Sequence, residues 1–135
     1  MVKEDKCILL QDLTARLPYG VILDYSFIEG KQRIHTKIPL TYRNIGMVAL
    51  DEWHTNEEIF KPYLRPMSSM TEEEYEQYRK FSYYGAAGYR NNDYKEMVAT
   101  PSFEKMDFLN AHHFDYRGLI EKGLALEAPE GMYKV

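Results

Sequence analysis

Residues 1–17 carry a helical pattern from residue 3 onward, because apolar side chains recur there at intervals of three and four. One line holds Cys7, Leu10, Thr14 and Leu17, and an adjoining line holds Leu9 and Leu13. Asp12 and Arg16 fall largely outside these lines, and Pro18 disfavours helical geometry at the residue before it. We therefore expect a helix that ends near Leu17 and turns its apolar side, Cys7 included, toward a core.

After this helix the period changes to two, which is typical of a half-buried strand. Val21–Ile28 alternates, Gly30 supplies the positive φ of a hairpin turn, and the chain returns through a second alternating run. The returning run has Ile34, Thr36, Ile38 and Leu40 on one face and Arg33, His35 and Lys37 on the other. Pro39 cannot donate a ladder hydrogen bond, so we expect this run to be an edge strand or to end there.

A turn at Asn44–Gly46 followed by an apolar run at Met47–Trp53 predicts a third strand. Residues 20–53 would then form a small three-stranded antiparallel sheet that could curve into a partial barrel. Residues 56–70 predict an ordered connection: one helical turn at Asn56–Phe60, then an extended segment that contains Pro62 and Pro66 and is held to the core by apolar side chains.

Residues 71–128 predict a helical part. Thr71 and Glu74 have the spacing of a capping box, which opens a helix from Glu72 to about Tyr84. Thr100–Pro101 opens another helix, with threonine as the cap and proline in the first turn. One side of that helix holds Phe103, Met106, Leu109 and His113.

Asp115 can cap a short third helix that ends at Gly123, and Leu124–Ala128 could be a final strand or a docked tail. A chain of 135 residues suits one domain. The elements together predict a single α+β domain over residues 1–135, with an N-terminal helix, a small antiparallel sheet and then about three helices.

Composition and charge exclude several classes of protein. The chain is 44% apolar and 28% charged, which is too apolar for disorder, and no run reaches the roughly 20 residues that span a bilayer. A single cysteine excludes an internal disulfide, so we expect a cytoplasmic protein without membrane contact. The net charge is −4, and the excess acids all lie in residues 68–135, which argues against a general nucleic-acid coat but leaves room for a local basic patch. Known nucleotide-binding, zinc-binding and catalytic-triad patterns are absent, so we expect no cofactor or metal and favour a non-enzyme.

Tyrosine is the outlier of the composition, with twelve residues, six of them between Tyr75 and Tyr94. Residues 83–94, YYGAAGYRNNDY, combine tyrosine with glycine, asparagine and arginine, as recognition surfaces do. The partner-binding candidates are Tyr83, Tyr84, Tyr89, Arg90 and Tyr94. The alternative is that these tyrosines pack inward and only their hydroxyl groups reach the surface, and we weigh the two readings as even.

A row of cations on one face of the returning strand is the second candidate, because it could follow a phosphate backbone. The nucleic-acid-binding candidates are Lys31, Arg33, Lys37 and Arg43, with His35 in the same row. The alternative is that charged side chains protect an exposed strand edge from unwanted pairing. We favour this alternative, because no aromatic residue alternates with the cations on that strand face.

The stretch DFLNAHHFDYRGLIEKG (residues 107–123) is densest in chemically active side chains. His112 and His113 point about 100° apart on a helix, so they cannot both bind one metal ion there. Acid–base catalysis needs only one histidine oriented by a carboxylate, which makes His112 and Asp115 weak catalytic candidates. We favour a structural reading, in which His113 is a hydrogen-bonded core histidine and Asp115 a helix cap.

Three stretches carry a resemblance: RLPYGV (residues 16–21), KPYLRPMSSMTEEE (residues 61–74) and DFLNAHHFDYRGLIEKGLALEAPEGMY (residues 107–133). They resemble a group of short uncharacterised proteins of gut Bacteroidales genomes, often in prophages and other mobile elements. The resemblance does not extend to the tyrosine-rich residues 83–94. The resemblance implies a bacterial or phage cytoplasmic setting. No activity is known for the group, so it implies no catalytic residues.

We therefore expect a non-enzymatic binding or accessory protein of a bacterial or phage mobile element, acting through protein–protein contacts of the tyrosine-rich segment. One alternative is a nucleic-acid-binding domain that uses the basic strand face. A second alternative is a small enzyme that uses the region of His112 and Asp115.

Overall fold

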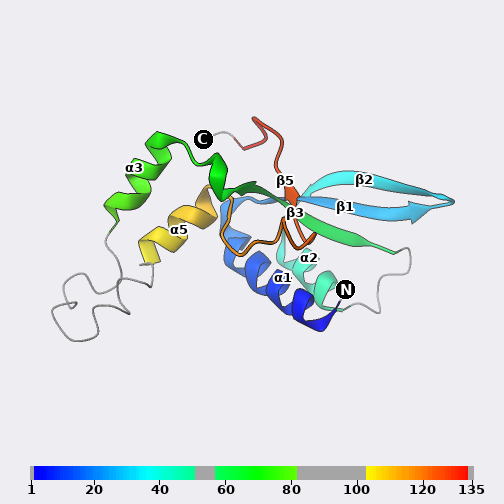
Figure 1. Cartoon of the computed structure of the whole chain (residues 1–135). Helices are drawn as coiled ribbons and strands as arrows, with labels where there is room; N and C mark the ends of the chain where they lie inside the picture. The colour runs from blue at the N-terminus through cyan, green and yellow to red at the C-terminus, as the bar shows by residue number, and fades with distance from the viewer. Residues whose placement is uncertain (1, 51–56, 82–102, 134–135) are drawn as a thin grey trace.

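A computed structural model describes residues 2–50, 57–81 and 103–133 of the chain. Its elements are, in order, α1 (Lys3–Arg16), η1 (Leu17–Tyr19), β1 (Ile22–Glu29), β2 (Gln32–Pro39), α2 (Tyr42–Ala49), β3 (Ile59–Pro66), η3 (Met67–Ser69), α3 (Glu72–Lys80), α5 (Phe103–Ala111), β4 (Phe114–Asp115) and β5 (Leu126–Glu127). Figure 1 shows the sheet with α1 and α2 on one side and with α3 and α5 beyond one end. The predicted α+β class and the N-terminal helix are confirmed.

The described sheet has five strands in the order β2-β1-β3-β4, with β5 also paired to β3. β1 and β2 form the predicted antiparallel hairpin, in which Gly30 has a φ of 65°. β3 lies antiparallel on the other side of β1 and pairs in parallel with β4 and β5. The sheet is thus mixed and does not close into a barrel, and β2 is an edge strand that ends at Pro39, as predicted.

The third strand is not where the sequence predicted it. Residues 42–49 form α2, because Thr41 and Asn44 make a capping box: the Thr41 hydroxyl accepts from the Asn44 backbone N–H, and the Asn44 side chain accepts from the Thr41 backbone N–H. Residues 51–53 of the predicted strand lie outside the described residues. The third strand is β3, in the segment expected to be a connection. Its Pro62 pairs with β1 on one side, while β4 and β5 begin to pair only beyond it.

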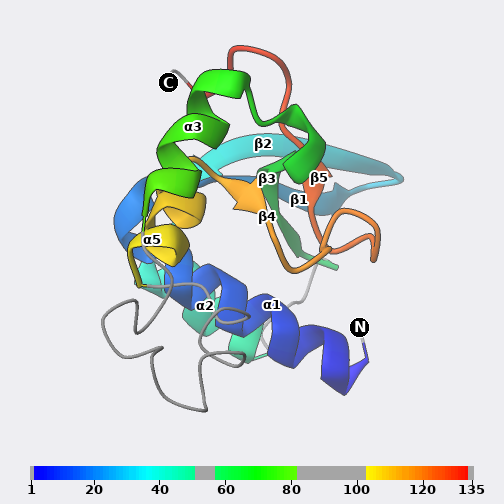
Figure 2. The same ribbon diagram turned by 60° about the vertical axis from the view of Figure 1, so that its left-hand side comes forward.

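The main core lies between one face of the sheet and the two helices α1 and α2, which Figure 2 shows side by side. It holds Leu9, Leu13, Val21, Leu23, Leu40, Val48, Phe60, Leu64, Leu119, Leu124 and Ala125. Cys7 is exposed, so the buried side of α1 is rotated from the predicted one. Asp12 and Arg16 are both fully buried, because they pair at 2.7 Å and Arg16 also donates to the backbone oxygen of Phe114 at 2.6 Å.

α3 and α5 pack around a smaller core of Phe108, Leu109 and Phe114. The predicted capping box of α3 is confirmed, and α3 ends at Lys80, before the predicted end. Phe103 at the start of α5 is 81% exposed, although it shares one side of the helix with Met106 and Leu109, which pack in or against this small core. Among the described residues, no helix is long and apolar enough to cross a membrane.

Candidate functional site

The tyrosine-rich residues 83–94, with all five partner-binding candidates, lie outside the described residues. Two of the six clustered tyrosines, Tyr75 and Tyr78, belong to α3 and line a groove of about 770 Å³ between this helix and η3. The other lining residues are Met67, Met70, Thr71, Glu72 and Glu76. The groove therefore contains the described part of the tyrosine cluster.

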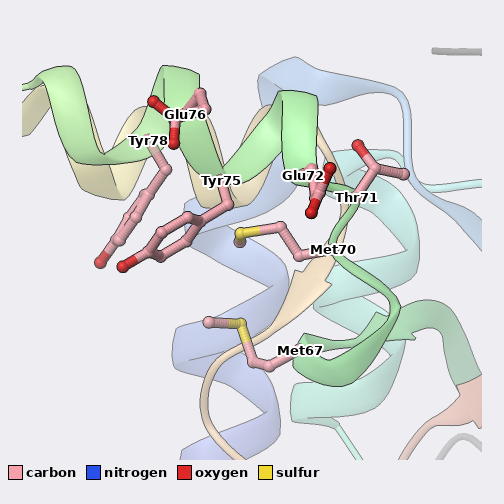
Figure 3. A pocket seen from close by; sticks show the side chains of 7 residues that line it. All are labelled: Met67, Met70, Thr71, Glu72, Tyr75, Glu76 and Tyr78. Atoms are coloured by element: carbon pink, nitrogen blue, oxygen red, sulfur yellow. The ribbon is translucent and has the colours of Figure 1, made fainter.

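Apolar side chains gather on one side of this groove. In Figure 3, Tyr75 and Tyr78 point to the same side of α3, and Met67 and Met70 extend toward Tyr75 from the preceding segment. Met67 is 41% exposed and Tyr75 is 52% exposed. Met70 and Tyr78 are partly buried against the smaller core. The groove thus has an exposed apolar wall and a floor anchored in the fold.

An ion pair between Arg65 and Glu74 fixes the start of α3 to β3. The guanidinium donates to both carboxylate oxygens at 2.7 Å, and it lies 4.2 Å over the ring of Phe114. Hydrogen bonding to Arg65 lowers the pKa of Glu74 to about 2, against the opposing effect of burial. Arg65 also donates to the backbone oxygen of Ser69 in η3. The groove is therefore held in place by charged groups that are themselves largely buried.

The structure also brings residues of three strands to one face of the sheet. Because side chains alternate along a strand, this face is the one turned away from α1 and α2. It carries Arg33, His35 and Lys37 of β2, Asp24 and Ser26 of β1, and Lys61 and Tyr63 of β3. We call this set the polar sheet face. In the strand register, Asp24 lies between Lys37 and Lys61. The ammonium of Lys37 is 5.8 Å from the ring centroid of Tyr63, so the face includes an aromatic ring that the alternation of β2 could not reveal.

The predicted nucleic-acid-binding residues do not all lie on this face. Lys31 sits in the exposed hairpin turn. Arg33 donates to Ser26 Oγ and lies 3.5 Å from the carboxylate of Glu57, so its charge is partly compensated. Arg43 belongs to α2, the helix that contributes Val48 to the main core. Of the predicted set, only Arg33 and Lys37 therefore lie on the polar sheet face, and Lys61 was missed.

A histidine–aspartate pair lies on the polar sheet face. Nδ1 of His35 is 3.0 Å and 3.2 Å from the two carboxylate oxygens of Asp24. The Asp24 side chain is 6% exposed and that of His35 is 59% exposed. An ionised carboxylate only accepts hydrogen bonds, so the tautomer that fits this contact carries its hydrogen on Nδ1 and its lone pair on Nε2. Sequence reasoning placed His35 in the cationic row and did not pair it with Asp24.

The candidate pair His112 and Asp115 is not joined by a hydrogen bond. Nδ1 of His112 lies 3.0 Å from the backbone oxygen of Phe108. The Asp115 carboxylate accepts from the backbone N–H groups of Leu119 and Ile120 at 2.9 and 3.0 Å, so it caps a turn where we predicted a short helix. This arrangement favours the structural reading of Asp115.

His113 is buried, as the structural reading expected, but its Nδ1 does not make the expected hydrogen bond. That atom has no partner among the described residues, and the ring instead stacks on Tyr133 at a centroid distance of 3.7 Å. Burial lowers the pKa of His113 to about 4, with further lowering by the nearby Arg16. Within the described ranges, no three His, Cys, Asp or Glu residues form a group that could hold a metal ion.

Comparison with known proteins identifies no relative of this chain. No protein family, no curated protein and no solved structure matches the chain. A function therefore has to follow from the described residues themselves.

Proposed function

We propose that the protein is a binding module that takes an amphipathic helix of a partner protein into the groove on α3. The observation that carries this proposal is the exposed apolar wall of Met67 and Tyr75 over the anchored floor of Met70 and Tyr78. Apolar side chains gathered in an exposed groove mark interaction sites. Methionine adds adaptability, because its unbranched side chain fits many apolar shapes.

The charges around the groove define the partner further. The lining contains Glu72 and Glu76 and no lysine or arginine. Glu76 pairs with Arg79 at 3.1 Å, but both side chains are more than half exposed, so this pair contributes little and can be exchanged. A helix with apolar side chains at positions i, i+4 and i+7 and with lysine or arginine at its borders complements this groove. In the setting that the sequence resemblance implies, the module would be an accessory protein of a mobile element.

Selection from a displayed library of helical peptides tests the proposal. We expect the selected peptides to share the apolar spacing and the basic borders, and to bind at least about tenfold more weakly to the Met67→Ser and Tyr75→Ser variants, as loss of a buried anchor predicts. Tyr42→Ser is the matched control, because Tyr42 is an even more exposed tyrosine that lies on α2, away from the groove lining. Peptides that bind both groove variants as tightly as the wild type would rule out this groove.

The polar sheet face supports a second candidate function, the binding of single-stranded nucleic acid. The specific observation is that Lys61 and Tyr63 of β3 join the cations of β2, which places an aromatic ring among positive charges. Cations that follow the backbone and rings that stack on bases are the two parts of such sites.

Fluorescence polarisation with a short labelled single strand tests this second candidate. We expect the affinity to fall steeply as salt rises, and to fall further in the Lys37→Ala/Lys61→Ala variant. The control is Lys3→Ala/Lys122→Ala, which changes the net charge equally at exposed positions away from this face. Salt-independent binding, or equal loss in both double variants, would exclude the polar sheet face.

A further inference from the structure

We propose that the Asp24–His35 pair is a catalytic site that cleaves RNA at the phosphodiester bond next to a ribose 2′-hydroxyl. This inference rests on the second candidate function, because the RNA strand must first lie across the polar sheet face. It assigns the catalytic role to a histidine that the alternation of β2 places in a row of cations.

The geometry separates the two members of the pair by role. Asp24 is a positioning residue: its carboxylate is almost fully buried and holds the ring of His35 through Nδ1. His35 is the catalytic residue, since its ring is exposed and its Nε2 can reach a bound strand. A histidine held through one nitrogen by a carboxylate is an arrangement that general bases use.

The neighbouring strands provide the charges that the reaction needs. Across β1, the residue opposite His35 is Ser26, whose hydroxyl accepts a hydrogen bond from Arg33, so a third cation lies on this face near the pair. Lys37 and Lys61 flank Asp24 from β2 and β3. Two strand spacings across the sheet and two residues along it separate His35 from Lys61, on the order of 12 Å between their Cα atoms, a gap that the long lysine side chain can reach across to a phosphate beside His35. Tyr63, beside Lys37, offers a ring on which a neighbouring base can stack.

These groups account for each proton that moves and each bond that forms or breaks in the proposed step. Nε2 of His35 takes the proton of the 2′-hydroxyl while the 2′-oxygen forms a bond to phosphorus. The bond from phosphorus to the 5′-oxygen breaks, and this oxygen keeps the electron pair and takes a proton from the ammonium of Lys61. Lys37 remains charged and stabilises the non-bridging oxygens. The products are a 2′,3′-cyclic phosphate and a 5′-hydroxyl, and proton exchange with water restores both side chains. The substrate supplies the nucleophile, so a shallow site with one base and two cations is chemically sufficient.

A DNA oligonucleotide that contains a single ribonucleotide is the probe. We expect cleavage only after the ribonucleotide, with a 2′,3′-cyclic phosphate identified by mass spectrometry. His35→Ala should lower the rate by at least about 100-fold, as loss of a general base does, while binding of the all-DNA analogue stays unchanged. Added imidazole should restore part of the activity, because it can occupy the space left beside Asp24. Asp24→Asn should lower kcat with little change in KM, and Asp24→Glu should recover part of it.

The control is Thr36→Ala, an exposed neighbour on the opposite face of β2, purified in the same way. It should cleave at the wild-type rate, which separates the protein from a contaminating nuclease. Equal cleavage by His35→Ala and the wild type would overturn the inference. Binding of the analogue without cleavage of the probe would also overturn it but would leave nucleic-acid binding intact. Absence of binding would rule out both RNA cleavage and nucleic-acid binding by this face.

Discussion

Replacing Glu74 by glutamine should lower the free energy of unfolding by about 3 kcal/mol at neutral pH, and the difference should vanish in acid. Arg65 contacts both carboxylate oxygens at 2.7 Å and lowers the pKa of Glu74 from 4.5 to about 2. At about 1.4 kcal/mol per pKa unit, this difference corresponds to about 3 kcal/mol in favour of the ionised folded state. Because the pKa is lower in the folded state, the stabilisation is complete above pH 4.5 and is lost as the pH falls toward about 2.

Urea unfolding of the wild type and Glu74→Gln at pH 7, 4 and 2 measures this effect. Glu73→Gln is the control, since Glu73 is exposed in the same first turn and interacts mainly with the helix dipole, so its loss should cost less than about 1 kcal/mol. Equal free energies for the wild type and Glu74→Gln at pH 7 would refute the reasoning. So would a difference as large at pH 2 as at pH 7.

Three further changes test the buried polar groups. The free energy of unfolding of the wild type should fall as the pH drops from 6.5 to about 4, because the unfolded chain binds a proton at His113 before the folded chain does. His113→Asn should remove this part of the loss in urea titrations, and an unchanged pH dependence would contradict the prediction. Asn also tolerates the positive φ of 64°. Asp12→Asn should lower the free energy of unfolding by about 3–5 kcal/mol, because it leaves the charge of Arg16 buried without its partner. The double variant Asp12→Leu/Arg16→Met removes both charges and should lower it by less. A larger loss in the double variant would refute this reasoning. Tyr133→Phe should cost about 1–3 kcal/mol in thermal or urea unfolding, because its hydroxyl joins β1 to β3, and no change would contradict that role.

Local patterns predicted those parts of the fold that depend on neighbours in the chain. The hairpin of β1 and β2 follows from alternation and Gly30, and the start of α3 follows from its capping box. β3 was missed, since its two prolines argue against a strand, and its pairing with the distant strands β1, β4 and β5 stabilises it there. α2 was missed because Asn44–Gly46 has the composition of a turn, whereas its role is to begin a helix.

The candidate site residues also divide into those that depend on neighbours in the chain and those that depend on distant contacts. The hairpin register already places Asp24 and Ser26 beside the cations of β2, so sequence could have found the pair with His35. It could not have found Lys61, because β3 reaches this face through a distant pairing. Nor could it predict that Asp12 and Arg16 are buried, which depends on the chain near Phe114 covering α1.

The late position of residues 114–133 in the chain bears on when the protein folds during synthesis. These residues supply Leu119, Leu124 and Ala125 to the main core, accept a hydrogen bond from Arg16 of α1, and join β1 to β3 through Tyr133. While they remain in the exit tunnel of the ribosome, α1 and the hairpin have no complete core to pack against. We therefore expect roughly the first hundred residues to leave the ribosome with exposed apolar surface, and the main core to form only after residues 114–133 have emerged. Sequence separations of this kind slow folding, which makes the nascent chain a natural client of chaperones.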